Sequence, residues 1–197
     1  MHIAFLGTEH PARAQTERMV RAVYRAVYGA RVDAFPPLMV AALDGRGRAL
    51  CAAGLRTASS GFFSECYLDD PAEVSISRVA HTPVARNDVL EVTTLASVES
   101  CLTLKLAEFV IEQQPFGAMR WGLFTGATAL LRALRHAGFA PLELAVAIPE
   151  RIADASQWGT YYRRSPRVCA IPLCGVASAE RSPAALSMAQ QQVAAVA

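Results

Sequence analysis

The chain has 197 residues, of which 53% are hydrophobic and 18% charged, and this balance is typical of a globular domain. Its formal net charge of +2 is too small to favour nucleic acid as a partner. The apolar runs are too short to span a membrane, and the N-terminus lacks the pattern of a signal peptide, so we expect a cytoplasmic protein. The five cysteines are scattered through apolar segments and indicate buried thiols rather than disulfides or zinc ligands.

The first half of the chain predicts one long helix and a group of antiparallel strands. Apolar residues recur at helical spacing from Pro11 to Tyr28, and Gly29 is typical of a helix end. An Asp-Gly pair at residues 44 and 45 is a strong hairpin signal between two apolar runs. The predicted strands cover residues 2–6, 37–43, 48–57 and 62–68, and a short helix follows at 69–79.

The second half predicts a strand–helix–strand unit, which closes as a right-handed crossover between parallel strands. Ser97 or Ser100 is a candidate cap of its helix, and Pro172 suggests that the last strand lies at an edge or ends there. The unit's strands cover residues 88–96 and 119–125 and its helix 99–114; a helix at 127–136 and strands at 142–148 and 167–173 follow. We therefore predict a single α/β domain over residues 1–177 and an Ala/Gln-rich tail over residues 178–197.

One carboxylate, Glu91, stands among apolar residues of the strand at 88–96. The alternation of side chains in a strand implies that it is at least partly buried. A buried carboxylate is either paired with an arginine or has a raised pKa that suits a general base. The sequence leaves these two interpretations equal.

Three segments together carry a resemblance to a known family. They are residues 67–73 (YLDDPAE), 91–96 (EVTTLA), and 158–162 (WGTYY) with 166–168 (PRV) behind them. In this order they resemble the small bacterial family called thermostable hemolysins, which is similar to acyl-homoserine lactone synthases and, more broadly, to the GNAT acyltransferase superfamily. The resemblance implies a GNAT-like acyltransferase fold: a mixed, mostly antiparallel sheet with a central parallel pair and helices on both faces.

The resemblance also implies an activity, the transfer of a fatty acyl group from a thioester to a small amine, without a metal or a tightly bound cofactor. Glu91 would remove a proton from the amine, directly or through water. Backbone N–H groups of Leu95 or Ala96 would polarise the thioester carbonyl if the strand bulges there. Tyr161 or Tyr162 would protonate the leaving thiolate, although either tyrosine could instead be a packed aromatic side chain.

The same resemblance assigns residues to the two substrates. Asp69 and Glu73 would bind the charge of the amine, although both could instead cap the following helix. The remaining residues expected at the amine are Tyr67 and Trp158. Those expected at the acyl donor are Thr93, Leu95, Ala96 and Ser97.

The donor is expected to be a thioester of acyl carrier protein or of coenzyme A, and we expect the carrier protein to be the better donor. Residues 96–101 (ASVESC) lack the glycines on which many GNAT enzymes hold the coenzyme A pyrophosphate. The acidic surface of a carrier protein could meet exposed arginines, with Arg132 and Arg135 as the main candidates and Arg18, Arg21 and Arg25 as further ones. Thr94 stands where the lactone synthases have arginine.

Two other classes of function stay open. The family name suggests a protein that lyses membranes directly, but the sequence has neither a spanning segment nor a strongly basic amphipathic helix. Lysis could also come from a membrane-active lipid product. A non-catalytic GNAT-like binding domain is the third interpretation, because the glycine-rich turn is missing.

Overall fold

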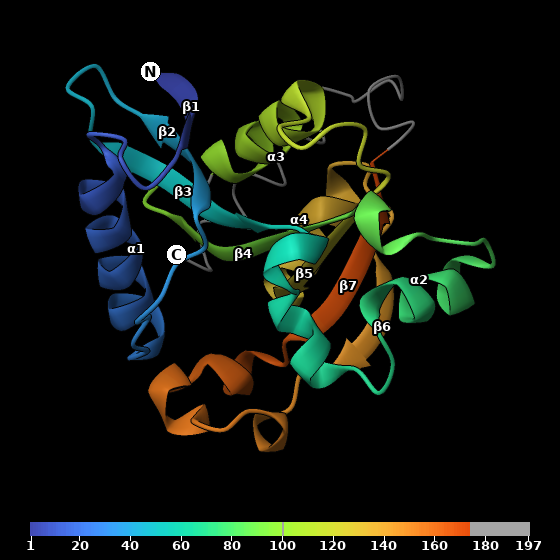
Figure 1. Cartoon of the computed structure of the whole chain (residues 1–197). Helices are drawn as coiled ribbons and strands as arrows, with labels where there is room; N and C mark the ends of the chain where they lie inside the picture. Colours follow the sequence, from blue (N-terminus) through green and yellow to red (C-terminus); the bar gives the residue numbers. More distant parts are fainter. Residues whose placement is uncertain (100, 174–197) are drawn as a thin grey trace.

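The computed structural model describes residues 1–99 and 101–173, and these form one seven-stranded sheet in the order β1-β2-β3-β4-β5-β7-β6 (Figure 1). The strands are β1 (His2–Leu6), β2 (Leu38–Leu43), β3 (Ala49–Arg56), β4 (Val89–Ser97), β5 (Trp121–Gly126), β6 (Leu142–Val146) and β7 (Arg167–Pro172). The helices are α1 (Arg13–Tyr28), α2 (Ala72–Ala80), α3 (Leu102–Gln113) and α4 (Thr128–His136). β4 and β5 are parallel and the other neighbouring strands antiparallel, which confirms the expected fold class.

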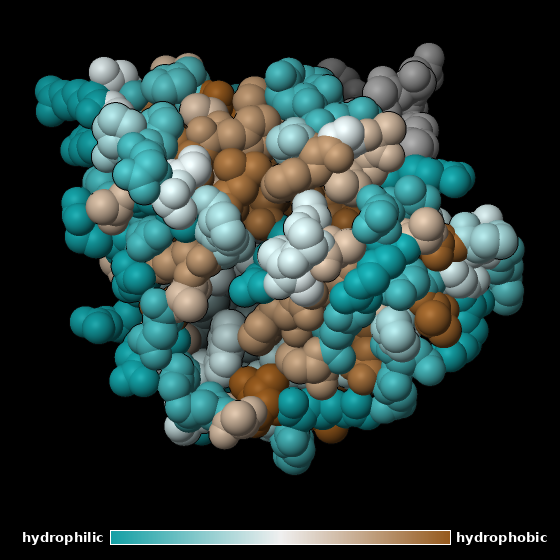
Figure 2. All heavy atoms as spheres, in the orientation of Figure 1, coloured by the Kyte–Doolittle hydropathy of each residue, from teal (hydrophilic) through white to brown (hydrophobic). Residues whose placement is uncertain are grey.

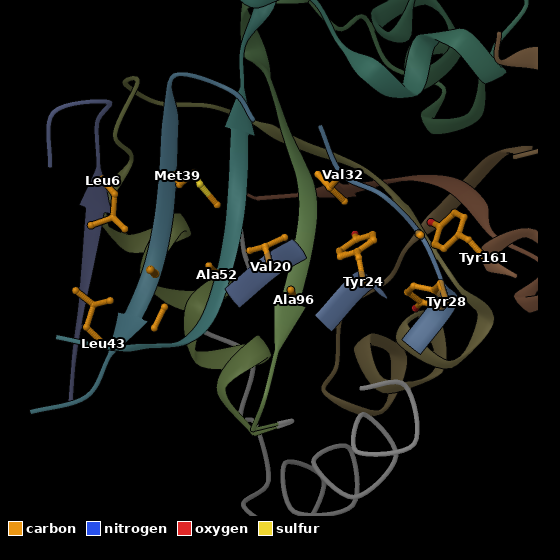
Figure 3. Close-up of a cluster of buried hydrophobic side chains, with 13 residues drawn as sticks. Leu6, Val20, Tyr24, Tyr28, Val32, Met39, Leu43, Ala52, Ala96 and Tyr161 are labelled. Carbon is orange, nitrogen blue, oxygen red and sulfur yellow. The ribbon is translucent and has the colours of Figure 1, made fainter. Parts of the chain in front are cut away.

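Helices cover both faces of the sheet. Successive residues of a strand point to opposite faces, so neighbouring apolar residues pack under different helices. Met39 packs against Val20 of α1, whereas the next residue, Val40, packs against Leu106 of α3. Figure 3 shows the α1 side of this arrangement, with Val20 and Tyr24 over the sheet. α2 covers the α1 face farther along the sheet, and α4 covers the α3 face there. The sheet is therefore the middle of three layers.

A bulge interrupts β4 near its end. Thr93 pairs with Gly54 and Ala96 with Ala52, so Thr94 and Leu95 together face a single residue of β3. Thr94 has a φ of 47°, a left-handed conformation that is rare for a β-branched residue. The extra residue reverses the alternation of side chains, so that Leu95 packs on the α3 side and Ala96 on the α1 side.

β4 and β5 separate at the same level. Their pairing ends with Val92 and Phe124, whereas β4 continues beside β3 to Ser97 and β5 continues beside β7 to Gly126. Thr94 and Leu95 consequently have no partner residue in either neighbouring ladder. The sheet is open at this point.

The strand expected at residues 62–68 is wrong. The chain there forms a 3₁₀ helix, η2 (Phe63–Tyr67), whose first two backbone N–H groups bind the carboxylate of Glu91 instead of a neighbouring strand. Between β6 and β7 the chain forms three more 3₁₀ helices: η4 (Pro149–Arg151), η5 (Ala155–Trp158) and η6 (Tyr161–Arg164).

Two smaller expectations also need correction. Ser97 does not cap α3, because its hydroxyl bonds to the backbone of Glu99 and the helix begins after Cys101. Pro172 ends β7, as one of the two alternatives predicted, but β7 lies inside the sheet between β5 and β6 and not at an edge. The expectations for Ser100, Cys174 and the tail at 178–197 lie outside the described residues.

Candidate active site

Glu91 is fully buried on the sheet face covered by η2 and α2. Its Oε2 accepts a hydrogen bond from the N–H of Phe63 at 2.6 Å, and its Oε1 accepts one from the N–H of Ser64 at 2.7 Å. Burial raises the pKa of Glu91 above its usual value, and the hydrogen bonds from η2 act against this rise. Within the described chain Glu91 forms no ion pair; its cross-strand neighbour Arg56 acts on it only through its charge.

The hydroxyl groups of Ser64 and Thr125 are hydrogen-bonded to each other near Glu91. The Oγ of Ser64 lies 2.8 Å from the Oγ1 of Thr125, which is the second-last residue of β5. Ser64 acts on the pKa of Glu91 through its side chain as well as its backbone. Ser64 therefore contacts both groups: its N–H binds the carboxylate, and its Oγ bonds to Thr125 at the opening of the sheet.

An apolar cavity of about 170 Å³ occupies this opening. Its walls come from β4, β5, α3 and α4, and from the aromatic residues at the end of α1. Residues Leu95, Ala96 and Ser97, expected at the acyl donor, line it. Other apolar side chains in the walls are Leu106, Val110, Phe124, Leu130, Leu134 and Ile171. The cavity therefore suits a hydrocarbon chain better than a polar molecule.

A second cavity, of about 350 Å³, lies on the side of η2 and η5, and we call it the aromatic cavity. Its rings belong to Tyr24, Phe63, Tyr67, Trp158 and Tyr161, so it includes Tyr67 and Trp158, both expected at the amine. The polar residues of its wall are Arg31, Asp33, Arg56, Ser64, Thr93, Thr94, Thr125, Asp154 and Gln157. The hydroxyls of Thr93 and Thr94 are buried there without a hydrogen-bond partner in the described chain.

The two cavities lie next to each other. Both are lined by Tyr24, Val92, Thr94, Thr125 and Tyr161. These residues surround the bulge of β4 and the point where β4 and β5 separate. The two cavities therefore share a wall here, and we call this place the junction.

The two candidate tyrosines are placed differently. Tyr161 is buried at the junction, and its hydroxyl donates to the carbonyl of Thr125 at 3.4 Å. Burial raises the pKa of Tyr161 well above its usual value, so the phenol keeps its proton at neutral pH. Tyr162 lines neither cavity; its hydroxyl bonds to that of Tyr67 at 2.7 Å.

Asp69 and Glu73, expected at the amine, are engaged elsewhere. Asp69 pairs with Arg151, and Glu73 pairs with Arg86 at 2.8 Å. Neither residue lines either of the two cavities described above, and neither side chain caps α2. The N–H of Ala72, at the start of α2, donates instead to Glu65 at 2.9 Å.

Arg132 and Arg135 lie exposed on α4, outside both cavities, and Arg135 pairs with Glu143 at 2.8 Å. Of the three arginines of α1 considered for a carrier protein, Arg21 donates to the carbonyl of Val32 at 3.0 Å. The remaining two, Arg18 and Arg25, are exposed. None of these arginines contacts the junction, so any part they have in donor binding is at the surface.

Sequence reasoning missed several residues of the two cavities. Ser64 and Thr125 are 61 residues apart, and no motif or spacing signals that their hydroxyls meet. Arg56 and Phe63 were also missed, because both stand at positions read only as parts of strands. No group of His, Cys, Asp and Glu able to hold a metal occurs among residues 1–99 and 101–173.

Solved structures similar to this one are acyl-homoserine lactone synthases and related enzymes. LasI, an acyl-homoserine lactone synthase, has 11% identity and a TM-score of 0.59 over 94% of each chain. BjaI, a coenzyme A-dependent acyl-homoserine lactone synthase in a structure with SAM and isopentyl-CoA, has 15% identity and a TM-score of 0.55, covering 97% of this chain and 88% of its own. FeeM, an N-acyl amino acid synthase from uncultured soil microbes, has 11% identity and a TM-score of 0.55, covering 87% of this chain and 91% of its own.

At these identities the likeness shows the fold, and the expected GNAT-like architecture of the lactone synthases is confirmed. The family model of the thermostable hemolysins matches residues 6–176, so the chain belongs to that family. No match is found among curated proteins.

Proposed function

We propose that this protein is an N-acyltransferase that moves a fatty acyl group from a thioester to a small amine. The observation that supports this most is that the apolar cavity and the aromatic cavity adjoin, with shared wall residues, at the break between β4 and β5. In this proposal the acyl chain lies in the apolar cavity and the amine enters the aromatic cavity. The thioester carbonyl then lies at the junction, beside the hydroxyl of Thr125.

The reaction requires a base for the amine. Its nitrogen attacks the thioester carbon, a C–N bond forms, and the nitrogen must lose a proton. Glu91 is too deeply buried to reach the amine, but Thr125 and Ser64 connect it to the junction. We assign the proton to Glu91 through these two hydroxyls, and the raised pKa of its carboxyl favours acceptance.

Two further groups support the other half of the reaction. The N–H of Leu95, at the bulge and without a ladder partner, would stabilise the oxyanion that forms on the carbonyl. When the C–S bond breaks, the thiolate takes up the proton that the amine has lost, and Tyr161, the phenol at the junction, would relay it by giving its own proton to the sulfur as it regains one. Tyr162 has no place in this scheme, because its hydroxyl lies against Tyr67.

Acyl carrier protein is the proposed donor. The turn before α3 has no glycine, and the hydroxyl of Ser97 already accepts the N–H of Glu99 at 3.2 Å. A pyrophosphate at this turn could not bind the N–H of Glu99, which is already donated to Ser97, and the negative charge of the Glu99 carboxylate would repel it. A carrier-bound pantetheine arm makes no such demand, and exposed Arg132 and Arg135 provide positive charge for an acidic carrier surface.

The experiment is a product assay with purified protein. Acyl carrier protein thioesters and acyl coenzyme A of several chain lengths are incubated with a panel of small amines, and amide products are identified by mass spectrometry with thiol release as a second readout. Amide formation that requires the protein is the expected result. Absence of both amide and released thiol for every donor and amine would refute the proposal.

The same preparation tests direct lysis. No helix among the described residues is long and apolar enough to cross a membrane. Figure 2 shows hydrophilic side chains over much of the visible face, with apolar ones gathered toward its middle. We expect red cells and liposomes to stay intact with protein alone and to lyse only after substrates have been added. Lysis by the protein without substrates would favour a direct lytic function.

A further inference from the structure

The aromatic cavity is lined by two arginines, of which Arg31 pairs with Asp33 and Arg56 forms no ion pair within the described chain. We infer that Arg56 binds a carboxylate of the amine substrate, so that the acceptor is an amino acid with an apolar or aromatic side chain rather than a simple alkylamine. This inference rests on the proposed acyltransferase function and adds the chemical class of the acceptor.

Arg56 ends β3 and is partly buried in the wall of the cavity. Within the described chain its side chain makes one hydrogen bond, from Nη1 to the carbonyl of Ser60 at 3.2 Å, and no ion pair. A guanidinium has five N–H donors arranged to bind a carboxylate with two bonds. The opposing acid, Glu91, already accepts one backbone N–H on each oxygen. Donors of Arg56 therefore remain available to a ligand.

The other charged side chains of the cavity are already engaged with protein groups. Arg31 pairs with Asp33 at 3.1 Å, and both side chains are more than half exposed. Asp154 accepts hydrogen bonds from Ser156 and Gln157. These residues form the rim, so a carboxylate that enters the cavity finds its available cation at Arg56.

Unpaired hydroxyls lie beside this cation. Thr93 pairs with Gly54 and Glu91 with Arg56, so Thr93 and Arg56 are on the same sheet face, near each other. The Oγ1 atoms of Thr93 and Thr94 are buried without a partner, although buried polar groups are normally hydrogen-bonded. A carboxylate or amine of the substrate would supply those partners.

Gly54 leaves the space that these groups need. A Cβ atom at this position would lie 2.8 Å from the Oγ1 of Thr93 and 2.6 Å from the Cγ of Pro36. A larger residue would therefore push the Thr93 hydroxyl from its place. Part of the cavity wall is made of rings, with Phe63 and Trp158 only 5.7 Å apart between centroids. A polar end at Arg56 and an apolar side chain against these rings match the two parts of such an amino acid.

Matched pairs of amines test the inference. Phenylalanine is compared with phenethylamine, and leucine with isoamylamine, since each pair differs only in the carboxylate. With one acyl donor, we expect kcat/KM of the wild-type protein to favour the amino acid of each pair. In R56Q, kcat/KM for the amino acid should fall about 10- to 100-fold further than for its decarboxylated partner, the range expected for a lost charged hydrogen bond. R56K keeps the charge without the two-bond geometry and should retain part of the preference.

R48Q is the matched control, because Arg48 is an exposed arginine that pairs with Asp44 in the β2–β3 hairpin, outside both cavities. It should keep the wild-type ratio between the members of each pair. Equal or better use of the decarboxylated amines by the wild type, or an equal loss for both members in R56Q, would overturn the inference while leaving the acyltransferase function standing. Failure of the wild type to acylate any amine would instead refute the proposed function, and this inference with it.

Discussion

The substitution Thr125→Val tests the proton path most directly. Valine keeps the shape of threonine but has no hydroxyl, so the connection from the junction to Ser64 is broken while Glu91 keeps its two backbone hydrogen bonds. Thr125 Oγ1 has one hydrogen bond to protein, with Ser64, among the contacts of the described residues. The change therefore removes a single neutral hydrogen bond from the folded structure.

The structure separates the two expected effects of T125V. Loss of one neutral hydrogen bond costs about 0.5–1.5 kcal/mol of the free energy of unfolding. For a domain of this size that lowers Tm by roughly 1–6 °C. A positioned general base contributes about 10²- to 10⁴-fold to the rate, so kcat/KM should fall by at least about 100-fold if the proton passes through Thr125.

Stopped assays of amide formation and thermal unfolding are measured on the same preparations. T125S keeps the hydroxyl and should restore most of the activity. T128V is the control, because Thr128 makes only long bonds to backbone carbonyls at the start of α4 and lines neither cavity. A folded T125V protein with turnover close to the wild type would refute the proton path.

Three further results are expected. Glu91→Gln replaces an acceptor oxygen with an NH₂ group and leaves a backbone N–H without a partner. Turnover should be lost, and the free energy of unfolding should fall by about 1–3 kcal/mol. Full activity in that variant would contradict the assignment of Glu91 as the base. Hydrogen bonds from Arg86 lower the pKa of Glu65, so this carboxylate stabilises the fold above its usual pKa and loses that effect as pH falls through the lowered value. The difference in Tm between wild type and Glu65→Gln should therefore shrink in acid. A constant difference in Tm from neutral to acid pH would show that the pair does not act this way. Carrier-dependent kcat/KM should fall with salt and in the double variant R132E/R135E, whereas indifference to both would leave these arginines without a role in donor docking.

Several elements follow from short-range patterns and needed no tertiary information. The hairpin between β2 and β3 forms because Asp44 accepts the N–H groups of Arg46 and Arg48, as its Asp-Gly turn suggested. Gly29 ends α1 with a φ of 67°, where a side chain would be strained. The parallel pairing of β4 with β5 follows from the helix between them.

The family motifs were found from the sequence, but much of what they do is structural. In the segment 67–73, Asp69, Asp70 and Glu73 form ion pairs with Arg151, Arg78 and Arg86. Tyr67 lines the aromatic cavity, whereas these three carboxylates line neither of the two cavities. A carboxylate in a motif does not reveal its partner, because each arginine lies 8 to 82 residues away along the chain.

Periodicity and turn residues, which act over a few positions, determined the parallel pair, the burial of Glu91 and the strands other than the one expected at residues 62–68, while the family resemblance implied helices on both faces. The tertiary structure decided what Glu91 binds and where the cavities lie. It placed the N–H groups of η2 on that carboxylate across 27 residues and joined Ser64 to Thr125 across 61. It also put the bulge of β4 at the level where β5 turns away. These contacts depend on how whole helices and strands pack together, so short-range sequence patterns do not predict them.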